Sequence, residues 1–185
     1  NVAWVLNIRG GDGPNSPVPN CRLIISKNKK IFLISKINKV KDLIKKKIIN
    51  LNELINIKDF SKKILKLKGN NFIIDDKSCS IYFENIIKSR FKIIKREDPI
   101  YLLKAIKNKT EIKNMIDTHI IDGVALTKFI YWIKNINKKK INEVQAQNKL
   151  EKYRKMNKND LYPSFDTIAG SGKNGAIVRY RAKKE

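Results

Sequence analysis

The chain has 185 residues, of which 42% are hydrophobic, and 41 Lys and Arg residues against 17 Asp and Glu residues give a formal net charge of +24. This apolar content can fill the core of one or two domains, and no apolar run approaches the roughly 20 residues of a membrane span, so we expect no membrane partner. Such a charge is typical of nucleic-acid-binding proteins, but the lysines are scattered among Ile and Asn residues, which share A- and T-rich codons. No recognition-helix, RNP-type or zinc-finger pattern accompanies them, so we expect no specific nucleic acid and only salt-sensitive binding to polyanions.

Short strands and helices alternate through the first hundred residues. Strands are predicted at residues 21–26, 31–34, 72–74 and 91–94, and helices at residues 40–49, 60–67 and 81–87. In the first of these helices, for example, Val40, Leu43 and Ile44 recur at helical spacing. This alternation predicts an α/β layer structure.

The alternation breaks at Asp98-Pro99, and the boundary that we favour falls between Asp98 and Lys109. The division is therefore a first domain of residues 1–104 and a second of residues 105–185.

Two helices are predicted at the start of the second domain. Thr110 is the predicted N-cap of the first, with the charge of Glu111 favourable in its first turn. Apolar residues at helical spacing continue this helix to about Ile136. The second helix is expected to open at Asn142 or Glu143 and to run through residue 156.

The segment 164–180 contains two short apolar runs on either side of a Gly-Ser-Gly-x-Asn-Gly loop. Gly170, Gly172 and Gly175 accept positive φ without steric cost, and Asn174 tolerates the left-handed region. Asn-Gly before a β-branched run is a strong hairpin signal, so we expect two strands around this loop. Local chemistry alone favours an ordinary surface hairpin.

A few isolated side chains could carry chemistry. Cys21 and Cys79 have no metal-ligand spacing and are interpreted as thiols in a reducing cytoplasm, with a disulfide as the alternative. His119, the only histidine, lies on or beside the apolar stripe of the long helix and is interpreted as a packed or hydrogen-bonded core residue. The carboxylate pairs Asp75-Asp76 and Glu97-Asp98 lie near predicted turns, where a structural or solvated role is expected.

Four stretches, in order along the chain, resemble the Xaa-Pro aminopeptidase (aminopeptidase P) family of pita-bread metallopeptidases. The matching stretches are Val2-Ala3-Trp4-Val5-Leu6-Asn7-Ile8-Arg9-Gly10 with Asp12 and Pro17-Val18, residues 104–126, residues 143–154, and residues 164–180 with the glycine loop. The chain begins inside the first motif and stops soon after the last, so we expect an internal fragment of a longer protein.

The resemblance implies a fold and an activity. The fold would be a creatinase-like α/β domain followed by the truncated start of an α+β pita-bread domain. The intact parent, a cytoplasmic homodimer, would remove the N-terminal residue that precedes proline, using two divalent metal ions, manganese or zinc. The family's metal ligands follow later than residue 180, so we expect no metal ligands, no catalytic residues and no activity in this fragment alone.

One substrate-binding position of the family falls inside the chain. The family pattern ends in Asn-Gly-Ala-Ile-x-His-Tyr, with the histidine at the active-site mouth, and here that position is Arg179. A guanidinium cannot act as a neutral acceptor, whereas an imidazole can. This exchange leaves open a catalytically inactive pita-bread module that binds peptides. The net charge leaves open a second alternative, a basic nucleic-acid-binding protein.

Overall fold

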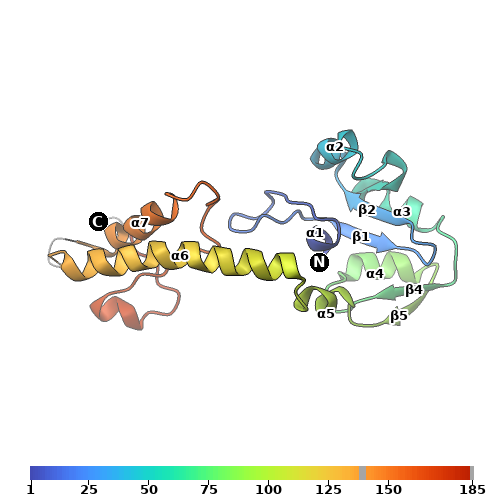
Figure 1. Ribbon diagram of the computed structural model, residues 1–185. Helices are drawn as coiled ribbons and strands as arrows, with labels where there is room; N and C mark the ends of the chain where they lie inside the picture. The colour runs from blue at the N-terminus through green and yellow to red at the C-terminus, as the bar shows by residue number, and fades with distance from the viewer. Residues whose placement is uncertain (138–140, 184–185) are drawn as a thin grey trace. The chain divides into compact units, whose positions relative to one another are not determined.

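The computed structural model describes residues 1–137 and 141–183, which divide into two compact units. The first unit contains residues 1–13 and 17–106, and the second contains Pro14–Ser16 and the chain from residue 107 onwards. Figure 1 shows the elements of each unit.

The first unit contains a three-stranded sheet in the order β1-β2-β3. Strand β1 (Arg22–Ile25) pairs antiparallel with β2 (Ile31–Ser35), and β2 pairs parallel with β3 (Leu54–Asn56). Helix α2 (Ile37–Lys45) and the 3₁₀ turn η1 (Leu51–Glu53) form the crossover that a parallel pair requires.

A second sheet in this unit repeats the same plan. Strands β4 (Asn71–Ile74) and β5 (Lys92–Lys95) pair in parallel, and helix α4 (Ile81–Lys88) connects them. The remaining elements of the unit are the helices α1 (Val2–Val5), α3 (Phe60–Ile64) and α5 (Ile100–Ala105) and the 3₁₀ turn η2 (Ile57–Asp59).

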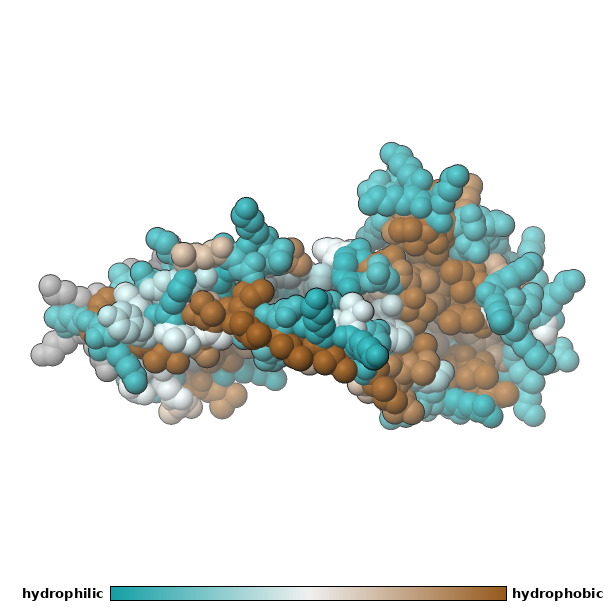
Figure 2. All heavy atoms as spheres, viewed as in Figure 1, coloured by the Kyte–Doolittle hydropathy of each residue, from teal (hydrophilic) through white to brown (hydrophobic). Residues whose placement is uncertain are grey.

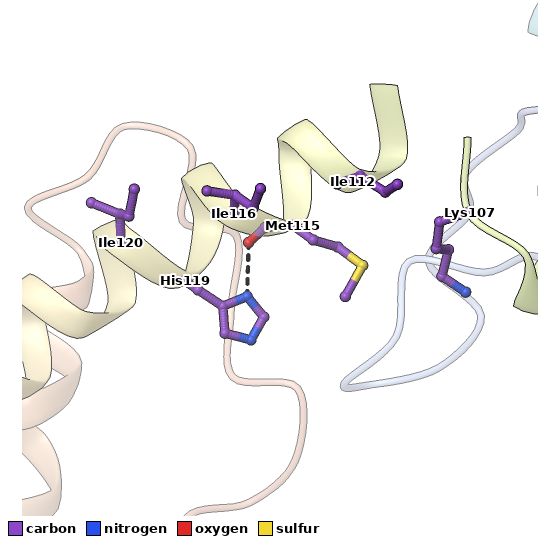
Figure 3. Close-up of a pocket in the computed structure, with 6 residues that line it drawn as sticks. All are labelled: Lys107, Ile112, Met115, Ile116, His119 and Ile120. Carbon is purple, nitrogen blue, oxygen red and sulfur yellow. Dashed lines mark hydrogen bonds between the residues drawn. The ribbon is translucent and has the colours of Figure 1, made fainter. Parts of the chain in front are cut away.

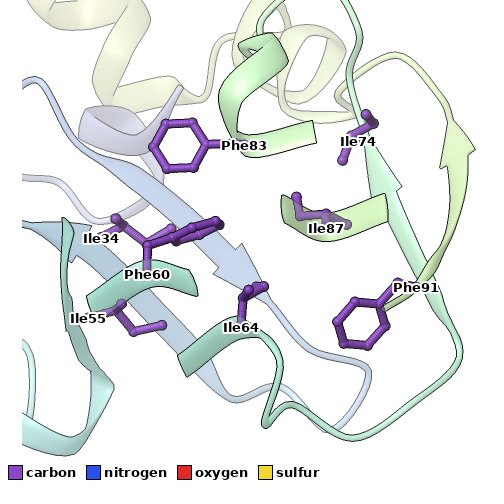
Figure 4. Packing of buried hydrophobic residues seen from close by; sticks show 8 residues of the cluster. All are labelled: Ile34, Ile55, Phe60, Ile64, Ile74, Phe83, Ile87 and Phe91. Carbon is purple, nitrogen blue, oxygen red and sulfur yellow. The ribbon is translucent and has the colours of Figure 1, made fainter. Parts of the chain in front are cut away.

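The larger hydrophobic core of the first unit lies among β2, β3, β4, α3 and α4, as Figure 4 shows. The rings of Phe60 and Phe83 meet edge to face with their centroids 4.6 Å apart, and Ile64 is completely buried beside them. The eight buried members are Ile34, Ile55, Phe60, Ile64, Ile74, Phe83, Ile87 and Phe91. A smaller cluster of Leu33, Val40, Ile49 and Leu54 packs on the other face of β2 and β3.

The second unit is built on two helices that lie side by side in Figure 1. Asn108 is the N-cap of helix α6 (Lys109–Asn135), and Asn142 is the N-cap of α7 (Glu143–Arg154). In each capping box, the side chains of the cap and of the third helical residue exchange hydrogen bonds with the backbone. A bidentate pair joins them, with Arg154 Nε 2.7 Å and Nη2 3.2 Å from the carboxylate of Asp122. The 3₁₀ turn η4 (Gly172–Ala176) follows later in the chain.

Most of the elements predicted from periodicity are confirmed, with shifted ends. The four predicted strands correspond to β1, β2, β4 and β5, and the predicted helices to α2, α3, α4, α6 and α7. Thr110 as the N-cap of the long helix is wrong, because the N-cap is Asn108, two residues earlier, whose side chain accepts from the Glu111 amide at 3.0 Å.

The predicted hairpin around the glycine loop is also wrong. Residues 164–183 contain no strand, and η4 occupies the centre of the loop. A strand needs a neighbour that accepts its ladder of hydrogen bonds, and none of the residues described in the second unit forms such a strand. Polar contacts with α7 hold the segment instead.

Candidate functional site

The glycine loop folds tightly because its backbone passes close to itself. A Cβ atom placed on Gly170 would lie 2.8 Å from the carbonyl oxygen of Asn174, a distance that real side chains do not reach. Gly172 has a φ of +55°, in the left-handed region. The Asn174 amide donates to the Ser171 carbonyl and the Ile177 amide to the Asn174 carbonyl, both at 3.1 Å, so the turn closes on its own backbone.

Glu143, the first residue of α7, binds this loop at three points. Its carboxylate accepts from the Ser171 amide at 2.5 Å, from the Asn174 side-chain amide at 3.2 Å and from the Tyr180 hydroxyl at 2.6 Å. The Tyr180 hydroxyl in turn accepts from the Asn174 side chain at 3.0 Å. One carboxylate therefore connects the beginning, the centre and the end of the loop to helix α7.

The charged form of Glu143 is favoured by these contacts. The hydrogen bond from Tyr180 lowers the pKa of the Glu143 carboxyl below its usual value, and the bond from the Ser171 amide lowers it further, against a smaller opposing effect of desolvation. The position at the start of α7 adds to this preference, because the N-terminus of a helix is the positive end of its dipole.

Arg179 precedes Tyr180, the last residue bound by Glu143. Its side chain is exposed, and its backbone has a φ of +56°, a left-handed conformation that few residues other than glycine adopt. The assignment of Arg179 to a substrate-binding mouth stays a prediction.

His119 is not a core residue, and this part of its interpretation is wrong. The ring is exposed on α6, and its Nδ1 lies 2.7 Å from the carbonyl oxygen of Met115, so the expected hydrogen bond is present without burial. The stripe on which it lies is uncovered in this structure, with Ile116 55% and Ile120 62% exposed. Figure 2 shows the row of hydrophobic side chains along α6.

An open groove of about 600 Å³ lies over this stripe, and Figure 3 shows its lining. The lining residues are Lys107, Ile112, Met115, Ile116, His119 and Ile120. The surface is almost entirely apolar, so the groove offers packing area and very little chemistry.

The carboxylates of the first unit have structural roles, as expected. Asp75 is buried and accepts from the Lys77 amide in the turn after β4, and Glu97 forms an exposed ion pair with Lys77 at 3.2 Å. Asp98 accepts from the Ile100 amide at 2.9 Å at the start of α5. Among residues 1–137 and 141–183, no group of three or more His, Cys, Asp and Glu side chains could hold a metal ion.

The two cysteines are free thiols, which contradicts the disulfide alternative. Both are half-buried, and burial raises the pKa of each thiol above its usual value. A raised pKa lowers the fraction of reactive thiolate, as is typical of cysteines with a packing role.

Sequence comparison matches each part of the chain to a family model. Residues 1–111 match the model of the creatinase/prolidase N-terminal domain, and residues 113–185 match that of metallopeptidase family M24. Relatives along the whole chain include a probable Xaa-Pro aminopeptidase P of Paracoccidioides brasiliensis (strain Pb03), 35% identical, and the Xaa-Pro aminopeptidase ApepP of Drosophila melanogaster, 31% identical. The chain spans 32% and 31% of the length of these two relatives.

Solved structures have the same fold. The prolidase from Pyrococcus furiosus matches 96% of this chain with a TM-score of 0.64 and 23% identity, over 49% of its own length. The Xaa-Pro dipeptidase from Bacillus anthracis matches 83% of this chain with a TM-score of 0.61 and 17% identity, over 41% of its own length.

The two family matches follow one another along the chain. The chain belongs to the creatinase/prolidase N-terminal domain family, and the residues that follow this domain match the model of metallopeptidase family M24. The expected fold class, a creatinase-like α/β domain followed by part of a pita-bread domain, is confirmed. No helix among the described residues is long and apolar enough to cross a membrane.

Proposed function

We propose that this chain is part of a metal-dependent aminopeptidase that removes the N-terminal residue before a proline. The observation that carries the proposal is the order of the two family matches along the chain, together with relatives named Xaa-Pro aminopeptidase that match its whole length at 31–35% identity. The substrate would be a peptide with proline at the second position.

The chemistry would need divalent metal ions, and residues 1–137 and 141–183 contain no group of three or more His, Cys, Asp and Glu side chains that could hold one. Metallopeptidases of this kind use divalent cations, which activate a water molecule and polarise the scissile carbonyl group. We propose two such ions, manganese or zinc, bound by residues of the longer protein. This chain would contribute the loop at residues 170–180, on the side of the substrate. We propose that the intact protein is a homodimer and that it lies in the cytoplasm.

The test is an assay of the longer protein that contains this chain. The protein is incubated with an Xaa-Pro-Pro peptide in the presence of manganese or of zinc, and the released N-terminal residue is measured. The proposal expects release of that residue, loss of activity with a chelator, and no release from a matched peptide in which alanine replaces the first proline. Equal cleavage of the alanine peptide, or no cleavage of either, would contradict it.

One observation favours a second function, a module that binds such peptides without cleaving them. By the resemblance to the family pattern, Arg179 would occupy the position of a histidine, and its guanidinium carries a permanent charge. Isothermal titration of the longer protein with the same peptide distinguishes the two functions, since a binding module takes up the peptide and releases no product.

A further inference from the structure

The carboxylate of Glu143 contacts residues far along the chain. Its three loop partners lie 28, 31 and 37 residues further along the sequence. The loop between them is exposed, with little apolar packing of its own, so polar contacts supply most of its order. A single carboxylate with three donors is a strong and directional anchor, because hydrogen bonds to an ionised acceptor are about twice as strong as neutral ones.

Glu143 is itself held in place. The capping box of Asn142 and Gln145 fixes the first turn of α7, with both hydrogen bonds at 2.9 Å. The bidentate contact between Arg154 and Asp122 then joins the far end of α7 to α6. The position of the carboxylate is therefore set by the two helices, and the loop adapts to it.

The loop connects the Glu143 carboxylate to Arg179. Tyr180 is bound at its hydroxyl by Glu143, and Ser171 is bound at its amide, so both ends of the segment between them are fixed. Arg179, next to Tyr180, has a left-handed backbone conformation and an exposed side chain.

We propose that Glu143 is a positioning residue, which fixes the glycine loop and, through Tyr180, sets the direction in which Arg179 points. The contribution of Glu143 to substrate binding rests on the function proposed above. Its hydrogen bonds to the loop do not depend on that function. Without the carboxylate, the Ser171 amide and the Tyr180 hydroxyl lose their acceptor, and the loop samples other conformations.

The hold on the loop can be measured in the 185-residue chain itself. Hydrogen exchange of the Ser171 amide reports the bond to Glu143 directly. We expect Glu143→Ala to accelerate this exchange at least about tenfold, and Tyr180→Phe, which removes one donor and keeps the ring, to accelerate it less. Glu151→Ala is the matched control, because Glu151 is on the same helix and its carboxylate lies 4.0 Å from the Lys155 ammonium group instead of binding the loop. Protected amides within α7 show that the variants are folded, and unchanged Ser171 exchange in a folded Glu143→Ala chain overturns the proposal.

The role in substrate binding is tested in the longer protein. Glu143→Gln keeps the length of the side chain but presents an amide to three donors, so we expect KM for an Xaa-Pro-Pro peptide to rise at least about fivefold with a smaller change in kcat. Glu151→Gln should change neither constant. Faster Ser171 exchange with an unchanged KM would show that the loop is fixed but does not position substrate. A longer protein that cleaves no such peptide contradicts the proposed function, and the exchange measurement then decides alone whether Glu143 fixes the loop.

Discussion

Gly170 is the position in the loop that has least room for a side chain. Because a Cβ atom would lie 2.8 Å from the Asn174 oxygen and 3.0 Å from its carbonyl carbon, the backbone must move to accept Gly170→Ala. We expect a cost of about 1–3 kcal/mol in the local stability of the loop, measured by hydrogen exchange of the Asn174 amide. Gly123→Ala is the control, because nothing lies within 4 Å of its added Cβ, and alanine should stabilise helix α6 by about 1 kcal/mol. Equal effects of the two substitutions would contradict the close approach.

Arg179 gives a second prediction at the scale of the residue. A fixed positive charge at the substrate mouth would disfavour the ammonium group of a peptide and remove a neutral acceptor, each worth on the order of 1–3 kcal/mol. We therefore expect the longer protein to cleave Xaa-Pro peptides poorly, and Arg179→His to raise kcat/KM at least about tenfold. Steady-state kinetics with manganese measures this. High and equal activity of the two proteins would mean that Arg179 does not lie at the mouth.

The ionisation of Glu143 makes the loop sensitive to acid. The pKa of Glu143 is lowered in the folded chain from its usual value of 4.5, mainly by the Tyr180 hydroxyl. The stabilisation is therefore complete above pH 4.5 and is lost as the pH falls through the lowered pKa of the folded chain. A pH series of the Ser171 amide resonance should show this titration in the wild-type chain and not in Glu143→Gln. A Ser171 signal that titrates equally in both chains would assign the effect to another group.

The sequence contains a local signal for the cap residue Asn108 and none for the loop contacts of Glu143. The pattern Asn108-x-x-Glu111 is a capping box that short-range reasoning can find, and choosing Thr110 overlooked it. Glu143 was expected only as a helix start. Its loop partners lie 28 to 37 residues away, and a local sequence pattern cannot predict a contact that forms only in the tertiary fold.

At the scale of the element, two neighbouring residues at the end of helix α3, Ile64 and Leu65, differ in burial. Ile64 is completely buried in the larger core, whereas Leu65 is 42% exposed. We expect Ile64→Ala to lower the free energy of unfolding of the first unit by about 2–5 kcal/mol, and Leu65→Ala to lower it by much less. Chemical denaturation followed by hydrogen exchange in β2 measures both. Similar losses would mean that α3 does not pack as described.

Helices were predicted more reliably than strands because their signal is contained within the element. The stripe at helical spacing from Ile112 onwards predicted α6 to its last turn, and it did so although that face is exposed. The strand β3 has three residues and was missed, since so short a run shows no alternation. The hairpin failed for the opposite reason, because its turn signal was strong but the residues described in the second unit supply no neighbouring strand.

For the whole molecule, the charge of +24 predicts how the chain interacts with polyanions. If the lysines reflect codon composition, binding to DNA should be indifferent to sequence and should weaken steeply with salt, because it arises from counterion release. A competition assay at low and at physiological salt measures this. A preferred DNA sequence bound thousands of times more tightly than random DNA would instead favour a nucleic-acid-binding protein.

Strand β2 lies between the two hydrophobic clusters of the first unit. Leu33 points into the smaller cluster and Ile34 into the larger, and their partners Leu54 and Ile55 on β3 do the same. Both clusters pack on strands β2 and β3, so unfolding of these strands would disrupt both clusters at once. The two halves of the unit should therefore melt in a single cooperative transition. A one-residue slip of β2 would also place each side chain in the wrong cluster, which gives the unit a built-in penalty against misregistered folding.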